Sequence, residues 1–101
     1  MTDSSSSAPD LSAVLHEAHA LVDRRRYAQA RSAISQGLRH FPENTELLYL
    51  SAFVDYVEDE NATAMRTVQQ ALARDPEHYG ARRLCAHLHE EAKEDAQAEG
   101  L

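Results

Sequence analysis

The sequence predicts an all-α protein of about five helices, arranged as antiparallel pairs that stack into a solenoid. Three observations support this fold class. Apolar residues recur at spacings of three and four along most of the chain, which is the period of an amphipathic helix. Two proline-containing segments, at residues 38–44 and 72–78, separate the periodic stretches. These segments also align with each other without a gap, which indicates an internal repeat.

The composition is that of one small, acidic domain. Its 101 residues are 43% hydrophobic and 6% aromatic, and they carry a net charge of −7. A low aromatic content with abundant alanine favours closely packed helices over an all-β fold. Affinity for phosphate backbones comes mainly from lysine and arginine, and here these residues form only short groups. We therefore expect no nucleic acid among the partners.

No segment of the sequence predicts export or membrane insertion. Residues 1–7 are polar and Ser-rich, without the basic and apolar segments of a signal peptide, and we expect them to form a disordered tail. No apolar run approaches the length that spans a bilayer. Cys85 is the single cysteine, so an internal disulfide is impossible and reducing conditions are compatible. We expect a cytoplasmic protein with no membrane partner.

The first helix is predicted to begin near residues 7–11 and to end near Arg24. Ser7 and Asp10 have the spacing of a capping box, and Pro9 falls in the first turn, where its missing N–H group costs little. The apolar residues of this segment recur with the period of one helix face. They are Leu11, Val14, Leu15, Ala18, Leu21 and Val22.

The second helix completes the first pair, which we assign to residues 8–43. It is expected to end around His40, because Pro42 disfavours helical geometry in the residue before it. Its apolar stripe consists of Tyr27, Ala30, Ile34 and Leu38.

A second helix pair is predicted over residues 44–77. Its first helix begins with Asn44 as the N-cap and runs to about Glu58. A polar turn at residues 59–61 leads into the next helix, which ends before Pro76. The apolar stripe of that helix consists of Ala62, Met65, Val68, Ala71 and Leu72.

A fifth helix is predicted to cap the array within residues 78–101. It runs from about Tyr79 to Ala92 or beyond. The acidic, Ala-rich residues that follow are helical if they pack against the rest of the protein and frayed if they do not. The apolar side of this helix consists of Ala81, Leu84, Cys85 and Leu88.

The internal repeat has an offset of 34 residues. Leu-Arg-His-Phe-Pro-Glu-Asn at residues 38–44 aligns with Leu-Ala-Arg-Asp-Pro-Glu-His at residues 72–78. The same offset relates residues that we expect to pack between helices. These are Ala18, Ala52 and Ala86, where helices would approach closely, and Ile34 with Val68, which would fill the space between layers.

With this period and these residues, the chain resembles the tetratricopeptide repeat family. Members of this family carry small residues where the helices of a pair cross, a bulky apolar residue in the second helix and a proline after it. Tyr27 fits the aromatic residue that often opens the second helix. The resemblance covers about residues 11–92, as two helix pairs and a closing helix. Arg25 and Asp59 depart from the family pattern, which has glycine in the turn inside each pair.

Asp55 is a further departure, because Leu21 stands at the same place one repeat earlier. An unpaired buried carboxylate is costly, so we expect Asp55 to pair with Arg82 or Arg83 of the fifth helix or to face solvent. A role in partner recognition is the alternative.

The resemblance implies that the first helix of each pair lines a concave face, so that the first, third and fifth helices form a groove. The residues that the repeat offset places there are Leu15, His19, Val22, Tyr49, Phe53, Tyr56, Arg83, His87 and Glu90. An aromatic, apolar centre is typical of an anchor for a peptide or helix of a partner protein. Alternatively, Tyr49 and Phe53 belong only to the core. We do not expect the carboxylate-binding specificity of some family members, because its places hold Leu15, His19, Tyr49 and Phe53.

A structural role in self-association is the second functional hypothesis. Helical repeats usually need about three units to bury a continuous core, and this chain has two and a half. The missing burial could come from a well-fitted fifth helix, from a homodimer, or from further repeats if the chain is the N-terminal piece of a longer array.

Catalysis and metal binding are not expected. Cys85, His87 and His89 form the tightest group of potential ligands, but side chains two residues apart on a helix point to different sides. The sequence contains neither a glycine-rich phosphate loop nor a nucleophile motif. The sequence therefore predicts a protein-binding module that is not an enzyme, with no metal and no cofactor.

Overall fold

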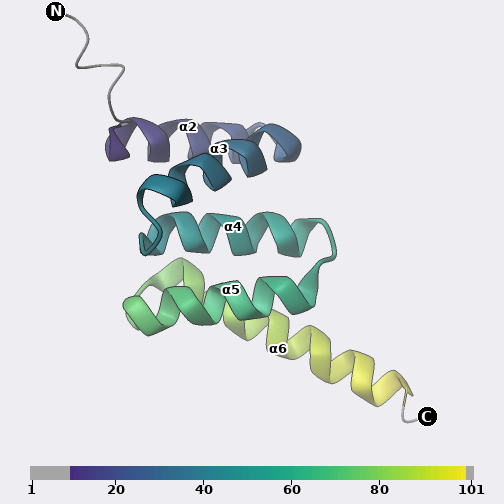
Figure 1. Ribbon diagram of the computed structural model, residues 1–101. Helices are drawn as coiled ribbons and strands as arrows, with labels where there is room; N and C mark the ends of the chain where they lie inside the picture. Colours follow the sequence, from purple (N-terminus) through teal and green to yellow (C-terminus); the bar gives the residue numbers. More distant parts are fainter. Residues whose placement is uncertain (1–9, 100–101) are drawn as a thin grey trace, which may run out of the picture.

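The computed structural model describes the backbone of residues 10–99 and the side chains of residues 10–93. Within this part of the chain the protein has five helices and no strand (Figure 1). The helices are α2 (Leu11–Asp23), α3 (Tyr27–His40), α4 (Thr45–Val57), α5 (Asn61–Arg74) and α6 (Tyr79–Glu99). None of these helices combines the length and the apolar character needed to cross a membrane. The all-α fold of packed helix pairs is thus confirmed.

Helix α2 begins directly after Asp10, which acts as its N-cap. The Asp10 side chain accepts a hydrogen bond from the N–H group of Ser12 at 3.3 Å. Ser7 of the predicted capping box lies outside the described residues, as does the predicted disordered tail at residues 1–7. At the other end, the acidic segment is helical in its backbone as far as Glu99.

Helix α4 lies at the centre of the stack and contacts all four other helices. Figure 1 shows the helices stacked in chain order, with α2 and α3 at one end and α5 and α6 at the other. A helix surrounded in this way must be apolar on several sides, which explains the unusually hydrophobic sequence of α4. Its buried apolar residues are Leu47, Leu48, Leu50, Ala52 and Val54.

Two hydrophobic clusters hold the stack together, one on each side of α4. The cluster between α2, α3 and α4 consists of Ala18, Ala30, Ile34, Leu50 and Val54. The cluster between α4, α5 and α6 consists of Leu48, Ala52, Ala64, Val68, Ala71, Ala81, Leu84 and Leu88. As predicted, Ala18 and Ala52 are fully buried where helices approach closely, and Ile34 and Val68 fill the space between layers.

The predicted burial of Ala86 is wrong, because this residue is exposed. Ala18 and Ala52 are each covered by the second helix of their own pair. No described helix follows α6, so the equivalent side of α6 is uncovered. Helix α6 instead buries the side that faces α4 and α5, with Ala81, Leu84 and Leu88.

The turn inside each helix pair has the same backbone geometry. Arg25 has a φ of 61° and Asp59 a φ of 66°, so both lie in the left-handed region. In the first turn the Arg26 N–H group donates to the carbonyl of Leu21 at 2.9 Å, and the equivalent bond of the second turn is 2.8 Å long. This is the Schellman arrangement, in which glycine is the usual left-handed residue. The two non-glycine residues therefore keep the geometry that glycine adopts most easily.

Replacing Arg25 by glycine is expected to stabilise the protein. A side chain in the left-handed region costs about 1 kcal/mol or more, and Arg25→Gly removes this cost. The matched control is Arg24→Gly, because Arg24 has a φ of −87° and gains only flexibility in the unfolded chain. In urea unfolding we expect the free energy of unfolding to rise by about 0.5–1 kcal/mol for Arg25→Gly and to fall by a similar amount for Arg24→Gly. The same change in the free energy of unfolding for both variants would contradict the assignment of strain to Arg25.

The first turns of α4 and α6 are capped by side chains at equivalent repeat positions. The Asn44 side chain accepts a hydrogen bond from the N–H group of Leu47 at 3.0 Å, which confirms its predicted N-cap role. His78, 34 residues later, accepts one from the N–H group of Ala81 through Nδ1, also at 3.0 Å. Because Nδ1 accepts this bond, the single N–H proton of the neutral imidazole lies on Nε2.

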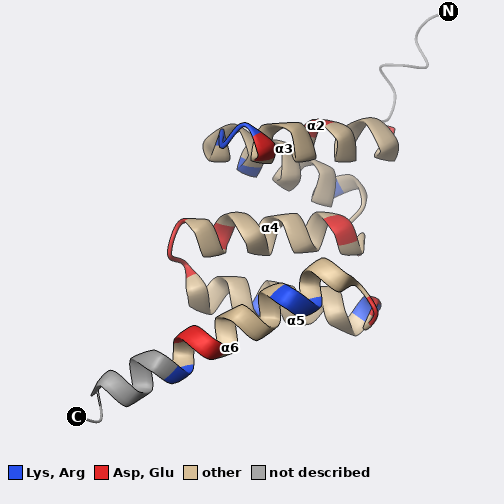
Figure 2. Cartoon of the chain, turned by 180° about the vertical axis from the view of Figure 1, so that it is seen from behind, with Lys and Arg blue, Asp and Glu red and all other residues tan. Residues whose placement is uncertain are grey.

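The two turns inside the helix pairs carry opposite charges. Figure 2 shows the α2–α3 turn, residues 24–26, as basic and the α4–α5 turn, residues 58–60, as acidic, at the same end of the helices. An ion pair between Arg31 of α3 and Glu58 links the two helix pairs near this edge. This edge of the stack therefore gains favourable contacts between pairs, although each exposed ion pair contributes little by itself.

Candidate partner-binding site

A hollow of about 410 Å³ lies between α4 and α6. Five of the predicted groove residues line it, namely Tyr49, Phe53, Tyr56, Arg83 and His87. Three residues that were not predicted complete the lining, namely Tyr79, Gly80 and Leu84. Glu90, which was predicted, is exposed and lies outside the lining. The site is therefore built by α4 and α6 and has a largely aromatic wall.

The aromatic wall comes from one face of α4. The ring centres of Tyr49 and Phe53 are 6.3 Å apart with tilted planes, and those of Tyr56 and His87 are 5.8 Å apart. The Tyr49 ring also lies directly against the backbone of α6 at Gly80. A Cβ atom at Gly80 would be only 2.9 Å from Cζ of Tyr49. The absence of a side chain at Gly80 thus lets the ring sit where it does.

Tyr79 and Arg83 form the exposed rim of the hollow. Tyr79 is 72% exposed, and Cζ of Arg83 lies 5.8 Å from the centre of its ring. Residues four apart share one face of a helix, and a guanidinium above an aromatic ring is attracted to it. The repeat offset does not predict Tyr79 in the groove, because its repeat equivalent is Thr45, which has no groove role. Its four-residue spacing from Arg83 is the signal that would have placed it here.

Glu91 of α6 fastens one end of the site to α4 and α5. The Tyr56 hydroxyl donates to Oε2 of Glu91 at 3.1 Å, and Nδ2 of Asn61 donates to Oε1 at 3.2 Å. Burial raises the pKa of Tyr56, and the bond to Glu91 raises it further. Burial also raises the pKa of Tyr49, with a second contribution from the charge of Glu46. Both tyrosines therefore keep their hydroxyl protons at neutral pH and remain hydrogen-bond donors.

The three groove residues predicted on α2 do not line this hollow. Val22 packs on the cluster between α2, α3 and α4, and Leu15 is half-buried elsewhere on α2. Nε2 of His19 lies 2.7 Å from Oε2 of Glu46, and Nε2 of His78 lies 2.6 Å from the other carboxylate oxygen. Glu46 therefore links α2 to the start of α6 across α4. The sequence carries no signal for this bridge, because the bridge depends on the stacking of three separate helices.

Asp55 is buried, but its partner is not the one predicted. Nη1 of Arg31, on α3, lies 2.9 Å from Oδ1 of Asp55, and the same guanidinium bonds Glu58. Both carboxylates raise the pKa of Arg31, with Glu58 the larger cause. Neither Arg82 nor Arg83, both of them described, forms an ion pair with Asp55. The side of α4 that carries Asp55 faces the preceding helix pair, so its partner comes from α3 and not from α6. Asp55 is only 3% exposed, so it does not face solvent.

The potential metal ligands do not form a cluster. In the part of the chain whose side chains are described, no group of three His, Cys, Asp or Glu residues is placed to hold a metal ion. Cys85 is a free thiol and half-buried. His87 and His89 are both exposed, and of the two His87 alone lines the hollow. The arrangement of the hollow suits contacts with another molecule through aromatic rings and one guanidinium.

Comparison with known proteins does not assign a family. No model of a protein family matches the chain, and no curated protein matches it. Helical stacks of this kind support many functions, so the function has to be argued from the site.

Proposed function

We propose that this protein is a tetratricopeptide-type module that binds a segment of a partner protein in the hollow between α4 and α6. The observation that carries the proposal is an aromatic wall next to an exposed pair of Tyr79 and Arg83. Tyrosine and arginine are among the residue types that contribute most to binding at protein interfaces. The family assignment is supported by the 34-residue repeat and by the equivalent turns at Arg25 and Asp59.

The chemistry of the hollow favours an apolar side chain followed by an acidic group. The rings of Tyr49 and Phe53 and the side chain of Leu84 offer an apolar surface. Arg83 supplies a positive charge at the rim, where a carboxylate could accept hydrogen bonds from the guanidinium. Because the whole chain carries a net charge of −7, this local cation would determine how an acidic segment is oriented.

Selection of peptides from a random display library on the full chain tests the proposal. We expect the selected peptides to share an aromatic or aliphatic residue close to Asp or Glu. Tyr79→Ala and Arg83→Glu should each weaken their binding more than about tenfold, since truncation at interface hot spots commonly costs 2 kcal/mol or more. Arg82→Glu is the matched control, because Arg82 is the neighbouring exposed arginine outside the hollow.

Two results would count against this function. One is peptide binding that is unaffected by Tyr79→Ala and by Arg83→Glu. The other is a stable dimer of the free chain in sedimentation velocity that Tyr79→Ala dissociates. The dimer would favour the alternative function, in which the same hollow mediates homo-oligomerisation.

A further inference from the structure

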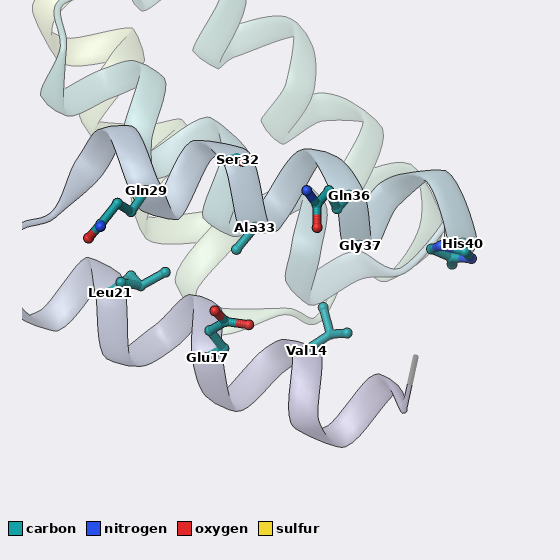
Figure 3. Close-up of a pocket in the computed structure, with 9 residues that line it drawn as sticks. All are labelled: Val14, Glu17, Leu21, Gln29, Ser32, Ala33, Gln36, Gly37 and His40. Carbon is teal, nitrogen blue, oxygen red and sulfur yellow. The ribbon is translucent and has the colours of Figure 1, made fainter. Parts of the chain in front are cut away.

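A second hollow, of about 520 Å³, lies between α2 and α3 at the other end of the stack. Figure 3 shows Val14, Glu17 and Leu21 of α2 pointing toward α3 across it. Its other lining residues, on α3, are Gln29, Ser32, Ala33, Gln36, Gly37 and His40. None of these residues belongs to the hollow between α4 and α6. The surface is therefore separate from the proposed function and does not depend on it.

The second helix pair keeps only a smaller hollow, at one end of the equivalent surface. The 34-residue offset carries Val14, Gln36 and His40 to Leu48, Gln70 and Arg74, which line a hollow of only about 280 Å³. That hollow is bounded in addition by Pro42 and Glu43, from the segment between α3 and α4. On α4, the part of the equivalent surface that carries Asp55 is instead covered by α3, through Arg31.

Helix α3 shows how a helix packs on the α4 part of this position. Its Arg31 reaches the Asp55 carboxylate on α4, and its Leu38 packs on the cluster between α4, α5 and α6. Residues seven apart lie on one face of a helix, so one stripe of α3 supplies both a cation and an apolar contact. The first helix pair has no preceding pair among the described residues, so its own hollow is open.

The open hollow contains a carboxylate, Glu17, but it lies one helical turn from the position equivalent to Asp55. The repeat equivalent of Asp55 is Leu21, and Glu17 lies four residues before it on α2. Figure 3 shows the Glu17 carboxylate directed into the gap between the helices. None of the ion pairs among the described side chains involves Glu17. Glu17 is exposed and Val14 and Leu21 are half-buried, so the rim of the hollow presents a negative charge flanked by two apolar residues.

We propose that this hollow docks a basic amphipathic helix of a partner protein, in the way that α3 docks on the second pair. Glu17 lies one turn closer to the N-terminus of α2 than Leu21, the equivalent of Asp55. A docking helix that runs antiparallel to α2, as α3 does to α4, would therefore need its cation one turn closer to its own C-terminus than Arg31 is in α3. Its cation would occupy the place of Ser35 in α3, between apolar residues in the places of Arg31 and Leu38. The pattern is apolar, basic and apolar at positions i, i+4 and i+7. Residues 1–9 contain no lysine or arginine, so that segment does not fit the pattern.

Two labelled synthetic peptides test the proposal with the full chain. Both have the sequence of residues 26–41 with Arg31→Leu and Gly37→Ala. One carries Ser35→Arg and the other Ser35→Glu. In fluorescence anisotropy titrations we expect the chain to bind the Ser35→Arg peptide about tenfold more tightly, because the Ser35→Glu peptide places a like charge on Glu17. The chain variant Glu17→Lys should reverse this order.

Matched variants separate this site from others. Glu77→Lys makes the same charge change on an exposed residue far along the chain, and it should leave the order unchanged. Ala33→Phe should abolish the binding of both peptides by filling the hollow, with unaltered circular dichroism and urea midpoint. Equal affinity for the two peptides, or an order unaffected by Glu17→Lys, would overturn the proposal. So would concentration-dependent self-association of the free chain that Glu17→Lys abolishes, because the occupant would then be a second copy.

Discussion

Arg31→Ala is expected to lower the free energy of unfolding by about 2–3 kcal/mol. The substitution leaves the Asp55 carboxylate, whose side chain is only 5% exposed, buried without its cation. Removing one partner of a buried ion pair typically costs about 3–5 kcal/mol. We expect a smaller value here because the Arg31 side chain is 42% exposed and is therefore partly solvated. Urea unfolding followed by far-ultraviolet circular dichroism measures the difference.

Two further variants isolate the buried charge as the cause. Arg74→Ala removes an arginine whose pair with Glu43, at 2.8 Å, is exposed on both sides, and it should cost less than about 1 kcal/mol. The double change Arg31→Met with Asp55→Leu should restore stability to within about 1 kcal/mol, since packed apolar residues often replace a buried ion pair without loss. If Arg31→Ala and Arg74→Ala unfolded at the same urea concentration, burial of the Asp55 charge would not be the cause.

The Arg31 and Asp55 pair shows where sequence reasoning stopped short. Asp55 stood out because its repeat equivalent is Leu21, but its partner was sought on the helix that follows. Arg31 is the matching departure, since its own equivalent is Met65. Each of the two residues is charged where the other repeat is apolar, and their charges are opposite. A search for a second departure of opposite charge would therefore have identified the pair.

The helices were predictable because their ends are set locally. Proline, the N-cap Asn44 and the polar turns act within a few residues, so the sequence around them is sufficient. Burial, in contrast, depends on which helices pack on each other. Ala86 occupies the repeat position of Ala18 and Ala52, but a residue at that position is buried only when another helix packs on it. Repeat position alone therefore predicts burial poorly in the last helix of a stack.

The candidate site was predicted on α4 and on part of α6. Tyr49, Phe53 and Tyr56 are found through the helical period, because they share one face of α4. The helical period does not show whether residues of α2 reach the same hollow. In the structure they do not, because all the residues that line the hollow come from α4 and α6. His19 instead bonds Glu46, a contact between helices that has no sequence signature.

Gly80→Ala is expected to lower the free energy of unfolding by about 2 kcal/mol and to weaken peptide binding between α4 and α6. The added Cβ atom would lie 2.9 Å from Cζ of Tyr49 and 3.1 Å from Cε1. These atoms belong to a rigid ring that also lies against Phe53 and His78, so the whole ring has to move. Forcing an extra methyl group into a packed contact commonly costs about 1–3 kcal/mol. Because Tyr49 lines the hollow, its displacement also changes the binding surface.

Gly37→Ala is the matched comparison, because Gly37 also lies in a helix with no room for a Cβ atom. The added atom would be 2.7 Å from a Val14 methyl group and 3.1 Å from a Leu47 methyl group. Val14 borders the open hollow between α2 and α3, so its methyl group can rotate away. Alanine favours the helix over glycine by up to about 1 kcal/mol at both positions, so the comparison depends on how far each neighbouring side chain can move. We therefore expect Gly37→Ala to stay within about 1 kcal/mol of the parent and to bind the selected peptides normally. Equal losses at both glycines would show that ring rigidity at Tyr49 does not decide the cost.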